Sequence, residues 1–228
     1  MSEDPRSRPP APRSRSRPER VAPVSQAQRH FWLLDQITGG HPVYNVPRRY
    51  RIRGPVDGAC LERALGEVAR RHEILRTRFP QRGNGPVQEV LPSHPFRLQI
   101  VDLSGRTEAE RAERLLALEA EAARRPFDLA EGPAWRATLA RLSTEDHVLL
   151  LALHHVVFDG WSRPLLEEEL SACYRAFARG MPPPLDPLPL QYADFAEWER
   201  ERHSDERLDR LLDWWTERLK DLPVIDLP

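Results

Sequence analysis

The sequence predicts an α/β protein in which a mixed β-sheet is flanked by helices. Segments with apolar residues at helical spacing alternate with segments typical of strands, and this alternation favours a sheet covered by helices. In addition, the run from Val148 to Leu153 is apolar at every position, as expected for a strand buried on both faces. With 228 residues, of which 40% are hydrophobic, the chain is long enough to bury a sizeable core.

Composition excludes several classes of function. The formal net charge of −1 argues against a general nucleic-acid binder, which would carry a basic excess. No apolar run approaches the roughly 18 residues of a membrane span, so we expect no membrane partner. Two cysteines, Cys60 and Cys173, are too few for a disulfide framework or a zinc site. A reducing, cytoplasmic location is therefore expected.

The chain divides into two parts by composition. Residues 1–22 are rich in proline, arginine and serine and nearly free of hydrophobic residues, so we expect a disordered leader that is a flexible tail or a weak docking arm. The segment lacks the apolar stretch of a secretory signal. Residues 23–228 are expected to form the folded domain.

Three helices and several short strands are predicted in the first half of the folded domain. Ser25 is a suitable N-cap for a helix that ends at Gly39-Gly40, and Asp57 for a second helix with a strong apolar stripe. Strands are predicted over residues 43–53, after residue 75 and over residues 96–103, with a hairpin turn at residues 82–85. Residues 107–125 are predicted to form the third helix, closed by Pro126.

In the second half, two strands precede three helices. The strands are predicted over residues 135–142 and 148–153, and the helices over residues 163–178, 191–202 and 205–219. Gly180 and the following prolines separate the first of these helices from the last two.

Two histidines end the buried strand and give the sequence its clearest functional signal. Because successive side chains of a strand face opposite ways, one of His154 and His155 should enter the core and the other a cleft. The two cannot easily bind one ion while the strand stays extended, and no third ligand follows at a metal-site spacing, so no metal is expected. Either both are hydrogen-bonded core residues, or one is a general base; the position at a strand end favours the base. Asp159 could orient a histidine or neutralise a buried arginine, and we favour the arginine.

Motifs for covalent catalysis and for nucleotide binding are missing. The chain has no G-x-S-x-G elbow, and Cys173 falls within a predicted helix. Neither of the glycine-rich phosphate-binding motifs, G-x-x-x-x-G-K-[ST] and G-x-G-x-x-G, occurs. A base without a covalent step suggests direct transfer of an activated group to an amine or hydroxyl.

Four stretches together resemble the condensation domains of non-ribosomal peptide synthetases. Residues 154–162, His-His-Val-Val-Phe-Asp-Gly-Trp-Ser, resemble the H-H-x-x-x-D-G signature of that family. Residues 25–32, 71–79 and 191–198 resemble its first, second and fourth core motifs, in the family's order. In the first of these, His30 stands where the family usually has arginine. The resemblance covers residues 23–228.

The resemblance implies a fold similar to chloramphenicol acetyltransferase, with two lobes and a histidine in the tunnel between them. It ends halfway through the family domain, so we expect this chain to be the N-terminal lobe, with the C-terminal lobe as a partner in the same or a separate chain. Carrier proteins would deliver acyl groups on phosphopantetheine arms, with no cofactor bound directly. The product would be an amide, and the isolated chain is expected to be inactive or weak.

The resemblance also implies roles for individual residues. His155 would be the catalytic histidine, with His154, Asp159 and Gly160 supporting it. Arg76 of the second motif is the expected partner of Asp159. Two further residues of the signature, Trp161 and Ser162, are candidates for the wall of the substrate channel.

Two alternatives remain open on sequence. The chain could be a non-catalytic lobe that binds a carrier protein or another partner chain. It could also be a free-standing acyltransferase that uses coenzyme A and completes its site with a neighbouring copy.

Overall fold

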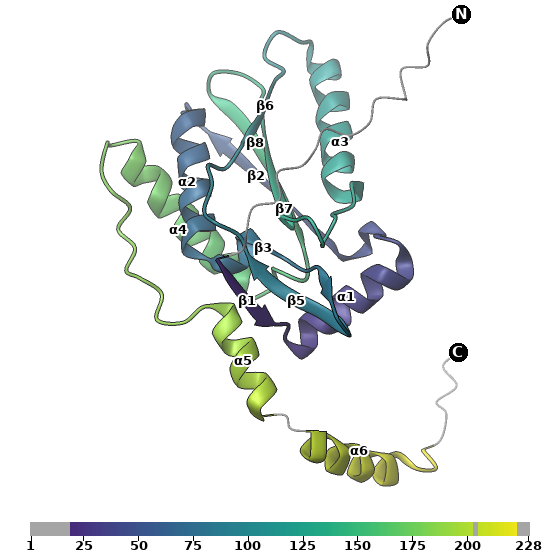
Figure 1. The fold of residues 1–228 in the computed structure, drawn as a ribbon. Helices are drawn as coiled ribbons and strands as arrows, with labels where there is room; N and C mark the ends of the chain where they lie inside the picture. Colours follow the sequence, from purple (N-terminus) through teal and green to yellow (C-terminus); the bar gives the residue numbers. More distant parts are fainter. Residues whose placement is uncertain (1–18, 203–204, 223–228) are drawn as a thin grey trace, which may run out of the picture.

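A computed structural model describes residues 19–202 and 205–222, which form two β-sheets and six α-helices within those ranges (Figure 1). The larger sheet has the strand order β2-β8-β7-β6, formed by β2 (Asn45–Arg53), β8 (Asp146–His154), β7 (Trp135–Arg141) and β6 (Gln99–Asp102). Strand β8 is antiparallel to both neighbours, whereas β6 and β7 are parallel. The sheet is therefore mixed and flanked by helices, as the sequence predicts.

Strand β8 is buried on both faces, which explains its continuous apolar run. Leu149, Leu151 and Leu153 belong to a core shared with α2 (Gly58–Arg71) and α4 (Ser162–Phe177). Val148 and Leu150 face the other way, into a second cluster with α3 (Glu108–Arg124). Figure 1 shows the same layers, with α3 on one side of the sheet and α2 and α4 on the other.

The smaller sheet is built around β5 (Gly85–Val90), which pairs with β1 (Arg20–Pro23), β3 (Thr77–Arg78) and β4 (Gln81–Arg82). Helix α1 (Gln26–Thr38) follows β1, and two 3₁₀ turns, η1 (Pro42–Tyr44) and η2 (Glu73–Arg76), lie before β2 and β3. Near the end of the chain, α5 (Tyr192–Arg202) leads to α6 (Asp205–Leu219), which lies apart from the two sheets (Figure 1).

The predicted helix starts carry the expected caps. The Ser25 hydroxyl accepts a hydrogen bond from the Gln28 backbone N–H, and the Gln28 side chain accepts one from the Ser25 backbone in return. Asp57 caps α2 through the backbone N–H groups of Ala59 and Cys60. Such caps satisfy the free N–H groups of a first helical turn. At the other end of α1, Gly39 is left-handed with φ of 65°, a conformation that glycine adopts at no steric cost.

The predicted boundary of the leader at residue 22 is wrong. Residues 20–22 belong to β1, which pairs along β5 with Val21 opposite Glu89 and with Ala22 buried. A four-residue strand has little pattern of its own, and here the distant partner strand specifies it. Residues 1–18 of the predicted leader lie outside the described residues.

Two predicted strands differ in extent. After residue 75 the chain continues as the 3₁₀ turn η2 before β3, which has only two residues. The strand predicted over residues 96–103 is reduced to the four residues of β6. Both segments lie at sheet edges, where fewer neighbours extend the pairing.

In the described part of the chain, no helix is long and apolar enough to cross a membrane.

The two-sided burial of β8 makes its leucines the most sensitive positions of the core. Leu151 is fully buried, and Leu151→Ala should lower the free energy of unfolding by about 2–5 kcal/mol because it leaves a cavity. Leu33 on α1 is 51% exposed, and the matched Leu33→Ala should change stability by less than about 1 kcal/mol. Urea denaturation of both variants measures the difference. Equal losses would contradict this account of the core.

Candidate functional site

The site begins where β8 ends at two adjacent histidines. The Val157 N–H donates to the His154 carbonyl oxygen at 3.0 Å, which turns the chain after the strand. Val156, Val157 and Phe158 are all buried, so the turn is anchored in the core. The His155 N–H donates to the Tyr44 carbonyl oxygen at 2.9 Å and ties the turn to η1. The histidine pair therefore has a fixed position at the end of β8, a central strand of the larger sheet.

His154 is the histidine that enters the core. It is 2% exposed, and its Nδ1 accepts a hydrogen bond from the Val156 N–H at 3.1 Å. The rings of Tyr44 and Phe127 stand edge-on to it. Burial, with a smaller contribution from His155, lowers the pKa of His154 to about 4. His154 is therefore neutral at physiological pH.

His155 faces a pocket of about 500 Å³. Its ring stacks on that of Phe31 in α1, with centroids 4.8 Å apart and planes 18° apart. Its Nδ1 is buried and has no hydrogen-bond partner among the described residues. The two histidines thus divide between core and pocket in the way that strand alternation predicts.

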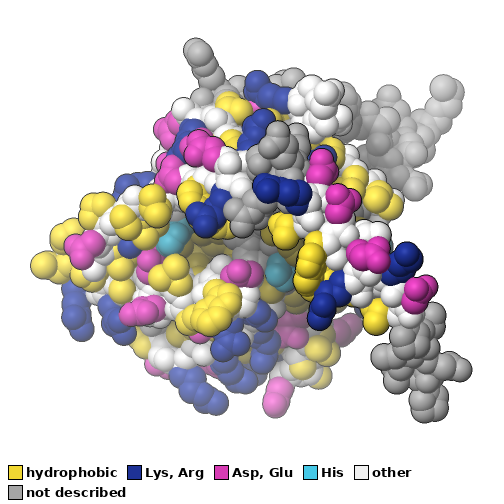
Figure 2. Space-filling view, turned by 90° about the horizontal axis from the view of Figure 1, so that it is seen from below, with side chains coloured by type: hydrophobic (Ala, Val, Ile, Leu, Met, Phe, Trp, Pro, Cys, Tyr) yellow, Lys and Arg dark blue, Asp and Glu magenta, His cyan; other side chains and the backbone are white. Residues whose placement is uncertain are grey.

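Segments far apart in the sequence form the walls of this pocket. The lining is largely apolar, with several polar side chains between: Ala27, Gln28, Phe31, His72, Ile74, His155, Val156, Val157, Phe158, Asp159, Ser162, Leu165, Leu188, Leu190, Gln191 and Tyr192. On the face seen from below, hydrophobic side chains gather and histidine side chains reach the surface (Figure 2). All four motifs of the sequence analysis contribute lining residues.

Hydrogen bonds between the motifs hold the walls together. The Ser25 hydroxyl that caps α1 also lies 3.0 Å from the Tyr192 hydroxyl at the start of α5. The buried side-chain amide of Gln28 donates a hydrogen bond to the Gln88 side chain on β5 at 3.2 Å. The cap of α1 therefore also fixes the helix against its neighbours, and with it the Phe31 ring under His155.

The Asp159 carboxylate organises the start of α4. Its Oδ1 accepts hydrogen bonds from the Ser162 N–H at 2.8 Å and the Ser162 hydroxyl at 2.6 Å. Burial raises the pKa of Asp159, but the hydrogen bonds from Ser162 and Trp161 together outweigh it and hold the pKa below its ordinary value. Asp159 is therefore ionised at neutral pH.

The remaining residues of the signature lie at the rim. Asp159 and Ser162 line the pocket, whereas Trp161 lies outside it and is 89% exposed. A Cβ added at Gly160 would meet no atom within 4 Å, so the described residues leave room for a side chain there. This lobe by itself therefore does not require a glycine at position 160 for space.

The predicted pairing of Arg76 with Asp159 is wrong for the described structure. The Arg76 guanidinium donates to the Glu19 carboxylate at 2.7 Å and to the Leu91 carbonyl oxygen, and it does not line the pocket. The 3₁₀ turn η2 directs Arg76 toward the smaller sheet and away from the end of β8. Within the described ranges, Asp159 makes no ion pair with an arginine.

Sequence reasoning missed some of the residues that line the site. Phe31, His72 and Tyr192 line the pocket but were not among the predicted site residues. Each belongs to one of the stretches that resemble family motifs, and that membership was the available signal.

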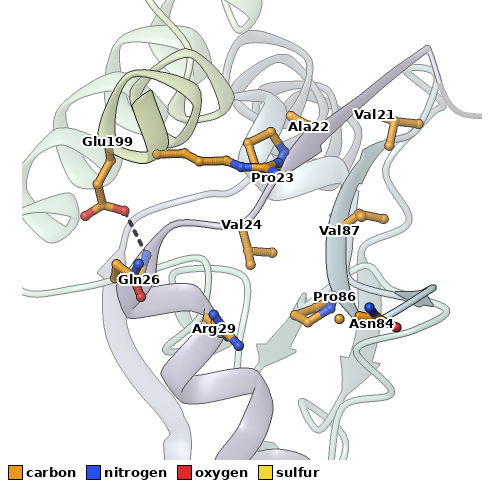
Figure 3. A pocket seen from close by; sticks show the side chains of 12 residues that line it. Val21, Ala22, Pro23, Val24, Gln26, Arg29, Asn84, Pro86, Val87 and Glu199 are labelled. Atoms are coloured by element: carbon orange, nitrogen blue, oxygen red, sulfur yellow. Dashed lines mark hydrogen bonds between the residues drawn. The ribbon is translucent and has the colours of Figure 1, made fainter. Parts of the chain in front are cut away.

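A larger pocket of about 610 Å³ lies on the other side of α1 (Figure 3). Val21–Val24, Asn84, Pro86 and Val87 form its walls, and Glu199 accepts a hydrogen bond from the Gln26 N–H beside it. It contains none of the predicted site residues. The smaller pocket at His155 is therefore the candidate functional site, on chemical grounds rather than size.

Neither a metal nor a thiol nucleophile is indicated in the described residues. They hold no group of three or more histidine, cysteine, aspartate or glutamate side chains able to bind an ion. Burial raises the pKa of the Cys173 thiol to about 11, so it stays protonated within the core.

Comparison with known proteins identifies the class to which this chain belongs. Residues 18–228 match the family model of the condensation domain, and the chain belongs to that family. Condensation domains of peptide synthetases are acyltransferases that form peptide bonds.

Similar curated proteins are large synthetases. The chain is 46% identical over 207 residues to phosphinothricin tripeptide synthetase PhsC of Streptomyces viridochromogenes, covering 90% of this chain and 19% of that protein. It is 43% identical over 208 residues to chondramide synthase cmdD of Chondromyces crocatus, covering 91% of this chain and 5% of that protein. The chain thus spans less than a fifth of the length of these relatives.

Solved structures share the fold. The X-domain from teicoplanin biosynthesis superposes with a TM-score of 0.77 at 34% identity, over 96% of this chain and 47% of that one. The starter condensation domain of rhizomide synthetase RzmA gives a TM-score of 0.77 at 22% identity, over 90% of this chain and 49% of that one. The chain therefore corresponds to about half of each solved domain.

The burial of neutral His154 predicts a pH dependence of stability. Its pKa is about 4 in the folded chain against about 6.5 unfolded, so the unfolded chain binds more protons between these values. The contribution of His154 to the free energy of unfolding should be fully present above about pH 6.5. It should be lost as the pH falls toward 4, by at most about 1.4 kcal/mol per pH unit.

Urea denaturation at several pH values measures this effect. His154→Gln should flatten the pH dependence relative to the wild type, because glutamine does not titrate. His94 is exposed in the loop before β6, and His94→Gln should leave the dependence as it is. An unchanged slope in His154→Gln would contradict a neutral, buried His154.

Proposed function

We propose that this chain is the N-terminal lobe of a condensation domain and that it carries, in His155, the histidine that acts in amide-bond formation. The donor would be an acyl group held as a thioester on the phosphopantetheine arm of a carrier protein. The acceptor would be an amine held on a second carrier protein. No cofactor would be bound directly by the lobe.

The observation that carries the proposal is the setting of His155. Its ring lies in a pocket of about 500 Å³ at the end of a buried strand, stacked on Phe31 of the first motif. Stacking and the backbone bond to Tyr44 fix the ring without occupying its nitrogen atoms. A fixed imidazole with free nitrogen is suited to proton transfer near neutral pH.

The proposed reaction is a single acyl transfer. The acceptor nitrogen attacks the thioester carbonyl carbon, a C–N bond forms, and the C–S bond breaks. His155 takes a proton from the attacking amine and delivers it to the departing thiolate, so the products are an amide and a free thiol. Neutral His154 adds no positive charge beside His155.

Asp159 and its neighbours would support this chemistry indirectly. The Asp159 carboxylate fixes the loop between β8 and α4 through Ser162, and this loop forms one side of the pocket. Ser162 would contact substrate from that side. The exposed Trp161 and the open space at Gly160 would face the second lobe, which would complete the channel.

A second lobe would complete the channel. The chain corresponds to 47% and 49% of two solved domains of the same fold, which is consistent with a missing half. Positioning two tethered substrates needs walls on both sides of the reacting atoms. The second lobe and the carrier proteins are therefore the proposed partners.

A non-catalytic binding lobe is the second candidate. The X-domain from teicoplanin biosynthesis, 35% identical to this chain, was solved in a complex with OxyB. By analogy, this lobe would serve as a docking platform for a partner protein. The two candidates differ in whether His155 is needed for turnover.

His155→Ala tests the catalytic role. In a complete two-lobed domain containing this chain, the substitution should reduce amide formation by about 10²–10⁴-fold, the usual contribution of a general base. Amide product from two loaded carrier proteins is measured by mass spectrometry. His94→Gln, which changes an exposed histidine outside the pocket, is the matched control and should keep full activity. Near-full activity of His155→Ala would refute the proposal and favour the binding lobe.

The isolated chain should be a poor catalyst. Purified residues 1–228 should form amide at least about 10²-fold more slowly than the two-lobed domain, because one wall of the channel is missing and substrates are poorly positioned. The same carrier-protein assay measures both. Comparable rates would show that one lobe is sufficient and would overturn the two-lobe account.

A further inference from the structure

A second histidine, His72, lines the same pocket as His155 and has no role in the reaction described above. It lies at the junction of α2 and η2, within the stretch that resembles the second family motif. Its side chain is 17% exposed, so the ring is largely enclosed but remains open on one side.

A buried carboxylate fixes the His72 ring. Glu169 of α4 is 4% exposed, and its Oε2 lies 2.6 Å from His72 Nε2. Its other oxygen, Oε1, accepts a hydrogen bond from Arg71 Nε at 2.9 Å. Carboxylate oxygens accept hydrogen bonds, so the His72 nitrogen that faces Glu169, Nε2, is the donor of this pair. In the tautomer with its proton on Nε2, the other ring nitrogen, Nδ1, is an acceptor.

This Nδ1 has no hydrogen-bond partner among the described residues, whereas the other polar side chains of the pocket are engaged. The Gln191 amide bonds to the Glu73 N–H and the Arg71 carbonyl oxygen. Each of the remaining ones, Gln28, Asp159, Ser162 and Tyr192, bonds to protein groups as described above. Apart from His155, His72 is the ring in this pocket with a nitrogen left for a ligand.

We propose that His72 binds the acceptor substrate, with Nδ1 accepting a hydrogen bond from its amine N–H while Glu169 holds the ring through Nε2. This inference rests on the proposed function of the pocket, in which a primary amine must lie near His155. One N–H of the amine would bond to His72 and the other would face His155, so that the lone pair is aimed at the thioester. The ligand class is a primary amine on a short carrier-bound chain.

Two isosteric substitutions separate binding from structure. In His72→Gln, the side-chain amide reaches the position of Nε2 and keeps a donor to Glu169, but no acceptor remains at Nδ1. In His72→Asn, the amide reaches the position of Nδ1 but loses Glu169. In the two-lobed domain, His72→Gln should keep its thermal stability and lose about five- to tenfold in kcat/KM for the acceptor, the effect of one hydrogen bond.

The relative stability and acceptor kcat/KM of the two variants distinguish a binding role of His72 from a structural one. His72→Asn should lose stability and keep more of the acceptor kcat/KM than His72→Gln. A purely structural His72 gives the reverse, with wild-type kinetics in His72→Gln, and that result would overturn the inference. His94→Gln serves as the control. If His155→Ala also keeps its activity, the proposed function fails as well; if only His155→Ala is inactive, the inference about His72 fails alone.

A spectroscopic measurement on the full 228-residue chain needs no variant. Ring ¹⁵N signals of His72 should indicate a proton on Nε2 and none on Nδ1. Addition of the amide analogue of glycyl-N-acetylcysteamine should shift the Nδ1 signal, and the N,N-dimethylglycyl analogue, which has no amine N–H when neutral, should not. Equal shifts with both probes, or none with either at concentrations on the order of 50 mM, would contradict an amine-binding Nδ1.

Discussion

The burial of β8 on both faces is the constraint on which the rest of the structure depends. Its leucines fill one core toward α2 and α4 and another toward α3, so the strand cannot shift by one residue without exchanging the two sets. That fixed register determines which histidine at its end is buried. His154 completes the core, and His155, just past the end of the strand, faces the pocket and stacks on Phe31 of α1.

The pocket depends on contacts between motifs rather than on any one of them. The cap of α1 bonds to Tyr192, and Gln191 joins α5 to the backbone around η2. These links bring Phe31 and His72 to the same space as His155. Most polar side chains in the pocket hydrogen-bond to protein groups, and the two histidines keep ring nitrogen atoms that do not. Within this largely apolar pocket, the imidazole rings of His72 and His155 are therefore the groups with nitrogen atoms free to contact a ligand.

Sequence patterns predicted the long elements well because those elements follow local rules. Helix stripes, caps at Ser25 and Asp57, and the apolar run of β8 all depend on neighbouring residues. The failures were at positions set by distant partners. Strand β1 exists because β5 lies beside it, and Arg76 is directed by η2 to Glu19 rather than to Asp159. Local pattern carries no information about such partners.

By itself, the sequence determined the fold class, the family and the position of two histidines at the end of a buried strand. Hydrophobic periodicity and motif order can be recognised from the order of the residues alone. Only the tertiary structure decided which side chains share a pocket. It joined His72 to Glu169, placed Phe31 under His155, and assigned Arg76 to the smaller sheet. These outcomes depend on packing between segments that are far apart in the sequence, and the free energy of such contacts belongs to the folded arrangement, not to any stretch of sequence.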